Sequence, residues 1–186
     1  MIGGNLPNLQ FHNIHVSKEK SNCPLIPDAL RIEKKINKYK KSDIVISQRF
    51  GKRVLINSKK DNKGEIRDNF LEIVDYDPIK ELFLIMGPKE PRIETPLHWF
   101  ILHARDEINA VVQINNINFI ENLNSDLPTT EKEYPIGTLD YTKEILKNLR
   151  DSKIVIIKNQ SILFVGSNLK EVEDLIFKNL RNKDEN

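Results

Sequence analysis

The sequence predicts an α/β domain in which a mixed β-sheet carries helices on its faces. Two patterns indicate this fold. Short runs rich in β-branched residues occur in pairs separated by turn residues, and segments with apolar residues at helical spacing are interspersed with them. At 186 residues, with 39% hydrophobic and 30% charged residues, the chain has the size and composition of one soluble globular domain.

The N-terminal 27 residues show no clear period and contain Gly3, Gly4, Pro7, Pro24 and Pro27, which predicts an irregular arm. From residue 28 to 41 the apolar side chains recur at helical spacing, at Ala29, Ile32, Ile36 and Tyr39. Charged side chains occupy the opposite face, so this segment is expected to be an amphipathic helix. Asp28 follows Pro27 and is the expected N-cap of this helix.

Two pairs of strands are expected next. The runs DIVISQRF and KRVLINS meet at Gly51 and Lys52, which predicts a hairpin. The polar stretch 59–68 is expected to be a loop. The runs NFLEIVDYD and KELFLIMG, joined around Pro78, predict a second strand pair. A helix is then expected from Thr95 as N-cap to about Arg105, with a proline in its first turn.

The C-terminal half continues the alternation of strands and helices. INAVVQIN is expected to be a strand, residues 140–150 a helix, and KIVIIKN and SILFVGS a pair of strands. The segment 168–180 is expected to be the last helix. Residues 28–182 are therefore predicted to form a single domain after an irregular arm at 1–27, with a frayed tail at 183–186.

The predicted strand INAVVQIN has two polar side chains, Gln113 and Asn115, in alternate positions. Alternation places both on one face of the sheet, which is where a metalloenzyme places two histidine ligands. Here both side chains are amides, so the strand has the spacing of a metal site without its usual ligands.

Four motifs, in this order and spacing, resemble those of the class II aldolase/adducin family. They are ETPLH, ARDEINAVVQIN, EYPIGTLDYTKEIL and VIIKNQSILFVGSNLKEVEDL. The resemblance covers about three-quarters of the chain and leaves out the N-terminal arm. It implies a three-layer α/β/α fold whose central sheet is mixed and largely antiparallel.

In that family three histidines bind a divalent metal, usually zinc, and a glutamate acts as acid and base. The resemblance places the histidine positions at Gln113, Asn115 and Gln160, and the glutamate at Glu94. A carboxamide oxygen is a neutral, hard ligand, whereas zinc prefers imidazole nitrogen or thiolate sulfur. We therefore expect the zinc of the family to be absent, with no other cofactor.

The phosphate-binding motifs of the family also differ. Only Ser47 remains of the turn that contacts a substrate phosphate, and Arg92 and Ile93 stand where the family has two serines before the glutamate. Arg92 is a candidate for binding an anionic ligand, or else for an internal ion pair with Glu94. Both alternatives are open from the sequence.

The remaining candidates are amides. Gln113, Asn115, Asn159 and Gln160 are suited either to hydrogen bonding with a small polar ligand or to satisfying one another as a buried cluster. Glu94, the one catalytic position retained, is a candidate acid/base, but without a metal a structural role is the favoured interpretation.

The leading hypothesis is thus a metal-free, catalytically inactive class II aldolase/adducin-like domain that serves assembly or the binding of a ligand or partner. The alternatives are a non-zinc enzyme using Glu94 and Arg92 on an anionic or sugar-phosphate-like substrate, and an aldolase/epimerase-type lyase with an altered metal site. The resemblance implies a homo-oligomer, with a tetramer the form to consider first. The basic segment 31–60 raises nucleic acid as a partner, but it is ranked last because only two aromatic residues, Tyr39 and Phe50, lie among its charges.

The compartment is predicted from two negative features. No apolar run approaches the length of a membrane helix, and the N-terminus lacks the plan of a signal peptide. The single cysteine, Cys23, cannot form an internal disulfide. These features predict a cytoplasmic protein that does not interact with membranes.

Overall fold

The computed structural model describes residues 11–59, 65–121, 123 and 126–181, and these residues build an eight-stranded sheet in the order β1-β5-β4-β3-β2-β6-β8-β7. The strands are β1 His12–Ser17, β2 Asp43–Phe50, β3 Arg53–Asn57, β4 Phe70–Asp77, β5 Leu82–Met86, β6 Ala110–Asn115, β7 Ile154–Ile157 and β8 Ser161–Gly166. All neighbouring strands are antiparallel except β1 and β5. The sheet is therefore mixed and largely antiparallel, as predicted.

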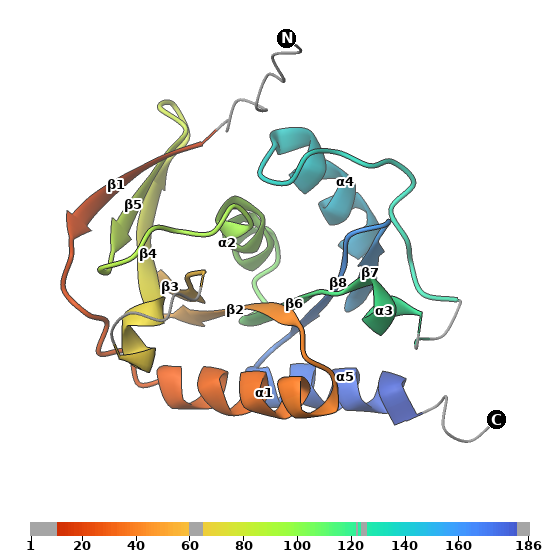
Figure 1. Ribbon diagram of the computed structural model, residues 1–186. Coiled ribbons are helices and arrows are strands. Elements are labelled where there is room, and N and C mark those ends of the chain that lie inside the picture. Colours follow the sequence, from red (N-terminus) through yellow and green to blue (C-terminus); the bar gives the residue numbers. More distant parts are fainter. Residues whose placement is uncertain (1–10, 60–64, 122, 124–125, 182–186) are drawn as a thin grey trace, which may run out of the picture.

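Helices cover both faces of this sheet. They are α1 Ile26–Tyr39, α2 Thr95–Ala104, α3 Ile117–Ile120, α4 Leu139–Leu149 and α5 Leu169–Arg181, with a short 3₁₀ turn at Ile66–Asn69. Helices α1 and α5 lie side by side on one face, and α2 and α4 lie on the other (Figure 1). The three-layer prediction is confirmed. None of the described helices is long and apolar enough to cross a membrane.

Strand alternation divides the apolar residues between two cores. On β6, Val111 faces the core under α2 and α4, while Val112 and Ile114 face the core under α1 and α5. Burial of these side chains from water is the main favourable contribution to the stability of a fold of this kind. The β6 strand lies between β2 and β8, so its polar residues are held at the centre of the sheet.

Three local predictions are corrected by the structure. The arm predicted as irregular contains β1, because its partner β5 follows about 70 residues later and no local pattern reveals such a pairing. Helix α1 begins at Ile26, with Leu25 at the N-cap position in place of Asp28, because Ile26 is fully buried. Helix α2 has Glu94 at the N-cap position and Thr95 as its first residue.

Two further segments differ from the expected loops. The 3₁₀ turn Ile66–Asn69 falls in the polar stretch predicted as a loop, and α3 forms in the Asn-rich region after β6. The remaining strands and helices form within a few residues of their predicted positions. Residues 1–10 of the predicted arm and the predicted tail at 183–186 lie outside the described residues.

Candidate functional site

The polar residues of β6 and the start of α2 form a continuous hydrogen-bonded network inside the protein. Cross-strand pairing brings Val45 of β2 and Leu163 of β8 beside Gln113, and Asp43 beside Asn115. Helix α2 packs over the same face of the sheet and contributes Glu94 and His98. Residues from four elements far apart in the sequence therefore meet at one point.

Gln113 lies at the centre of this network, and its side chain is completely buried. Its Nε2 lies 3.0 Å from Asn115 Oδ1, 3.0 Å from Ser161 Oγ and 3.5 Å from Tyr141 Oη. Its Oε1 lies 3.3 Å from His98 Nε2. Both ends of the amide are thus engaged by neighbouring side chains.

His98 connects Gln113 to Ser47. The Nδ1 atom of His98 lies 2.7 Å from Ser47 Oγ, and both residues are fully buried. Burial lowers the pKa of His98 to about 3; the positive charge of Arg92 adds to this effect, and the hydrogen bond to Gln113 opposes it. The imidazole is therefore neutral at pH 7. The arrangement fits a Ser47 hydroxyl that donates to Nδ1 and an Nε2–H that donates to Gln113 Oε1.

The other end of the network is ionic. Arg92 Nε donates to Glu94 Oε2 at 3.3 Å, and Arg92 Nη2 donates to Asp43 Oδ2. Asn115 Nδ2 lies 2.8 Å from Glu94 Oε1 and 3.1 Å from Asp43 Oδ2. The amide and the guanidinium together therefore link the two carboxylates.

The ion pair between Arg92 and Glu94 is buried, with 6% and 5% of the two side chains exposed. Burial lowers the pKa of Arg92, but Glu94 and Asp43 outweigh this effect and the pKa is raised overall. Arg92 thus stays charged and forms the internal ion pair that the sequence left open, while its role toward a ligand stays a prediction.

Two predicted site residues lie apart from the network. Asn159 is exposed in a left-handed turn, with φ of 56°, and its side chain donates to Glu133. Gln160 Nε2 donates to the carbonyl of Tyr134 at 3.3 Å, and its Oε1 is buried without a partner among the described residues. Of the three amides at the histidine positions of the resembling family, Gln113 and Asn115 are joined and Gln160 is not bonded to either.

Sequence reasoning missed Asp43, Tyr141 and Ser161 as members of the network. A signal for Ser161 was present: it stands two residues before Leu163, the cross-strand neighbour of Gln113, so alternation places it on the same face. For Asp43 and Tyr141 no local pattern was available. Burial raises the pKa of Tyr141, so its hydroxyl stays protonated.

A pocket of about 360 Å³ lies beside the ionic end of the network. It is lined by Glu33, Asn37, Lys41, Ser42, Asp43, Ile44, Asn57 and Arg92. Asn57 shapes its wall, because its side chain bonds the backbone of Ile44 and Ile46. The charged lining residues comprise two cations and two anions, so the pocket suits a polar ligand without an excess of either charge.

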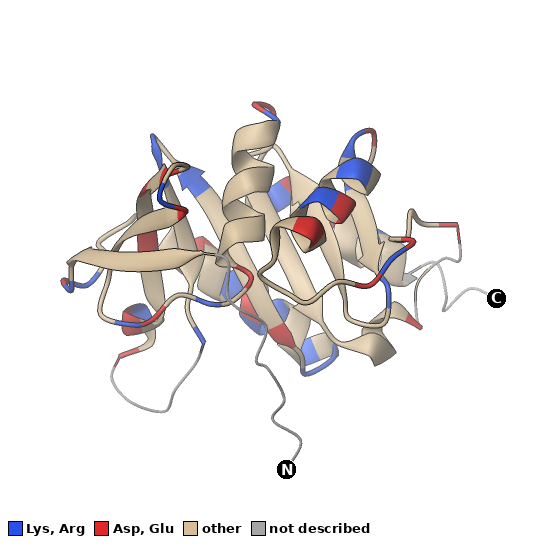
Figure 2. Cartoon of the chain, turned by 90° about the horizontal axis from the view of Figure 1, so that it is seen from above, with Lys and Arg blue, Asp and Glu red and all other residues tan. Residues whose placement is uncertain are grey.

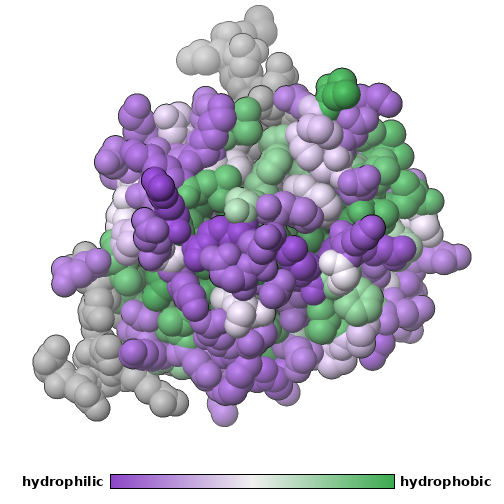
Figure 3. Space-filling model, turned by 180° about the vertical axis from the view of Figure 1, so that it is seen from behind, coloured by the Kyte–Doolittle hydropathy of each residue, from purple (hydrophilic) through white to green (hydrophobic). Residues whose placement is uncertain are grey.

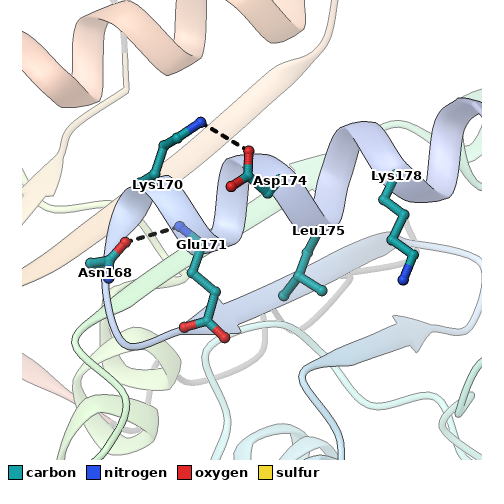
Figure 4. A pocket seen from close by; sticks show the side chains of 6 residues that line it. All are labelled: Asn168, Lys170, Glu171, Asp174, Leu175 and Lys178. Carbon is teal, nitrogen blue, oxygen red and sulfur yellow. Dashed lines mark hydrogen bonds and ion pairs between the residues drawn. The ribbon is translucent and has the colours of Figure 1, made fainter.

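A second pocket, of about 340 Å³, lies along the outer side of α5 (Figure 4). The side chains that line this pocket stabilise helix α5 itself. Asn168 accepts from the backbone N–H of Glu171, and Lys170 pairs with Asp174 one turn later. This pocket is therefore explained by helix capping and surface pairing.

No protein-family profile matches the sequence, and no curated protein sequence matches it significantly. Solved structures do match its fold. An L-fuculose 1-phosphate aldolase superposes with a TM-score of 0.69 at 13% identity over 89% of this chain and 85% of its own. A sugar-phosphate aldolase from Thermotoga maritima gives 0.68 at 13% identity over 86% and 92%.

The N-terminal class II aldolase domain of a conserved protein from Thermoplasma acidophilum gives a TM-score of 0.61 at 14% identity over 91% of this chain and 96% of its own. The chain therefore has the fold of the class II aldolases, which confirms the resemblance found in the sequence at the level of fold.

The zinc ion that this fold implies does not fit the side chains present. Gln113 Oε1 is engaged by His98, Asn115 presents its Nδ2 to two carboxylates, and both carboxylates are paired with Arg92. Within the part of the chain that the structure describes, no cluster of three or more His, Cys, Asp or Glu side chains is placed to hold a metal ion. The donor set is thus unlike the imidazole and thiolate sets that hold zinc.

Replacing Gln113 by leucine tests the central position of its amide. We expect Gln113→Leu to lower the free energy of unfolding by about 2 kcal/mol, because it leaves Nε2 of the fully buried His98 without a partner. The matched control is Gln160→Leu, which loses one bond to a backbone carbonyl and should cost less than about 1 kcal/mol. Urea unfolding measures both values, and equal losses would contradict the central role of Gln113.

Proposed function

We propose that this chain is a metal-free, catalytically inactive class II aldolase-like domain that serves in assembly or in the binding of a ligand or partner. One observation carries the proposal. Two of the three positions where the resembling family holds its metal, Gln113 and Asn115, and the acid/base position Glu94 are occupied by side chains that bond to one another and to their neighbours, from Ser47 to Arg92.

The state of Glu94 supports the absence of acid/base chemistry. Its carboxylate is 5% exposed and is bonded through one oxygen to Asn115 and through the other to Arg92. A general base has to reach the proton that it removes. The alternatives, a non-zinc enzyme using Glu94 and Arg92 or a lyase with an altered metal site, require Glu94 to leave both partners.

If the domain binds a small molecule, we place it in the 360 Å³ pocket beside Arg92 and Asp43, whose volume falls within the usual range for ligand sites. The balance of charge in the lining gives an anionic ligand no particular advantage over a neutral polar one. Asn159 and Gln160 lie outside this lining and are not part of the proposed ligand site.

Nucleic acid remains the last-ranked partner. The basic side chains of α1 are partly neutralised within the fold, since Arg31 and Lys35 both pair with the buried Glu173 of α5. Basic and acidic residues are interspersed in the view of Figure 2. We propose a cytoplasmic homo-oligomer. For Cys23 we propose a structural role, because burial raises the pKa of its thiol and so disfavours the reactive thiolate.

Metal analysis tests this proposal. Protein purified without a chelator or an affinity tag should contain far less than one zinc per chain after dialysis, and a zinc titration should show no tight site. The same preparation should not cleave L-fuculose 1-phosphate, with or without added zinc. Stoichiometric zinc retained through dialysis, or zinc-dependent cleavage, would overturn the proposal.

A matched variant makes the metal test more specific. The triple substitution Gln113→His, Asn115→His and Ser161→His supplies imidazole at the positions of three side chains that are hydrogen-bonded to one another in the structure. We expect zinc to bind this variant more tightly than the natural chain, provided that it folds, which circular dichroism establishes. An equal affinity for both chains would place any zinc outside these three positions.

A further inference from the structure

The β1 strand leaves one edge of the sheet without a neighbouring strand among the described residues. Its backbone bonds to β5 on one side, where the N–H of His12 donates to the carbonyl of Glu81 at 2.8 Å. In a parallel pair, alternate residues bond to the neighbour. The N–H and C=O groups of Asn13 and His15 therefore point away from β5, toward the open edge.

The opposite edge of the sheet is covered. At β7, the N–H of Ile156 donates to the carbonyl of Pro128, and the N–H of Thr130 donates to the carbonyl of Ile156. The β1 strand has no such cover in the described part of the chain, and its sequence HNIHVS holds none of the lysines, glutamates or prolines that protect natural sheet edges; its irregularity is a register shift against β5 between His15 and Ser17. The β7 edge of the sheet is thus covered, whereas the β1 edge is open to another strand within the described part of the chain.

The outer face of β1 is apolar. Ile14 and Val16 are 51% and 54% exposed on the face of the sheet opposite the aromatic core of Phe11 and Phe83. Ile14 lies beside the half-buried Leu84 of β5. Viewed from behind, hydrophobic residues gather along the side of the molecule where β1, β5 and β4 lie (Figure 3). An apolar strip therefore borders the open edge.

We propose that β1 is the contact between two copies of this chain, paired antiparallel about a two-fold axis at Ile14. The outward groups set the register. If Asn13 lies opposite His15 of the second copy, all four outward N–H and C=O groups of each copy form hydrogen bonds. Ile14 then faces Ile14 of the second copy, and His12 faces Val16, on the apolar side. The result is one continuous sheet through both copies.

Charge complementarity favours a second copy as the occupant. Lys18 follows β1 and is exposed, while Glu81 lies beside the start of β1. Neither residue forms an ion pair within the described residues. Antiparallel pairing brings the Lys18–Glu19 end of each strand to the Lys80–Glu81 end of the other copy, so that each end meets charges of both signs. Between these ends the strand has no charged lysine, arginine or carboxylate that would repel its own copy.

The interface rests on the assembly role proposed above, but its failure would be distinct, because zinc and cleavage assays do not depend on β1. Sedimentation velocity over a range of concentrations should show dimers of the natural chain. Ile14→Lys should make the protein monomeric, because two ammonium groups would face each other on the axis. Ile79→Lys, at a site 91% exposed on the β4–β5 turn, is the matched control and should leave the dimer unchanged.

Disulfide trapping tests the register. Facing residues of a non-hydrogen-bonded antiparallel pair have Cα atoms about 4.5 Å apart, within the range that a disulfide spans. Oxidation should therefore cross-link Ile14→Cys, whereas Val16→Cys faces His12 of the second copy and should stay monomeric on a non-reducing gel. The natural Cys23 is buried and does not compete.

Three outcomes would overturn the proposal. They are a monomer at all concentrations, a dimer that survives Ile14→Lys, and cross-linking of Val16→Cys in preference to Ile14→Cys. A chain that begins at Phe11 provides one more test: if it dimerises and the full chain does not, residues 1–10 are the occupant of the edge and the proposal fails for the full chain.

Discussion

Removing the charge of Arg92 is expected to destabilise the protein more than any other single substitution in the network. The variant Arg92→Met keeps most of the length of the side chain but leaves the buried Glu94 carboxylate without a counter-charge. Breaking a buried ion pair from one side typically costs about 3 to 5 kcal/mol. We expect a loss of that size in the free energy of unfolding measured in urea at pH 7.

The control is Arg31→Met. Arg31 also pairs with a buried carboxylate, Glu173, but it is half-exposed and Glu173 keeps a second partner in Lys35. This variant should therefore lose less than about 1 kcal/mol. The double variant Arg92→Met with Glu94→Gln removes both charges and should recover part of the stability lost in the single variant. A stable Arg92→Met protein would show that Arg92 is not required to hold Glu94 in place.

The Arg92→Met variant also tests the role of Arg92 in the two pockets that it lines. Arg92 lines both the 360 Å³ pocket and a smaller one of about 160 Å³, which Pro96 and Gly137 also line. The two pockets thus share Arg92, whereas Glu94 lines neither of them. If Arg92 serves only as the counter-charge of Glu94, a ligand that occupies either pocket should still bind the Arg92→Met variant. No acid/base reaction of that ligand should be observed in the variant.

The sequence predicted the central part of the fold well because the informative patterns there are local. The hairpins β2–β3 and β7–β8 bring together runs separated by a few residues, and Gly51, with φ of 61°, adopts the left-handed conformation that favours glycine in a tight turn. Alternation along β6 was sufficient to place Gln113 and Asn115 on one face, where they are hydrogen-bonded.

The predictions for the edge strand β1 and for the starts of the helices were wrong for a common reason. The pairing of β1 depends on β5, about 70 residues away, and the start of α1 depends on the core that receives Ile26. Capping preferences contribute about 1 kcal/mol, which is less than the value of burying an isoleucine side chain, so tertiary packing decides the boundary. Neither contact is encoded in nearby residues.

In the candidate site, the sequence identified residue types better than partners. It left Arg92 between a ligand-binding role and an ion pair with Glu94, and the pairing is decided by Asp43 and Asn115, which the strand register brings to the same place. Gln160 was predicted beside the two amides of β6 by resemblance alone. In the structure its neighbour Ser161 holds that place, because β8 presents alternate residues to β6.

Acid should destabilise the protein through His98. The folded chain holds this imidazole neutral down to about pH 3, since burial lowers its pKa, whereas the unfolded chain takes up a proton at about pH 6.5. Between these values the unfolded state binds more protons, so the free energy of unfolding falls as the pH is lowered. The loss should begin near pH 6.5 and reach about 2 to 3 kcal/mol by pH 4.5 from this residue alone.

The variant His98→Gln isolates this contribution from that of the carboxylates. A glutamine side chain can still accept from Ser47 and donate to Gln113 but does not titrate, so its absolute stability matters less than its dependence on pH. Urea unfolding at intervals from pH 7.5 to 4.5 should give a shallower slope for His98→Gln than for the natural chain. Parallel slopes would mean that His98 takes up a proton in the folded protein over this pH range, in which case its Nδ1–H donates to Ser47 Oγ and only the direction of that bond is reversed.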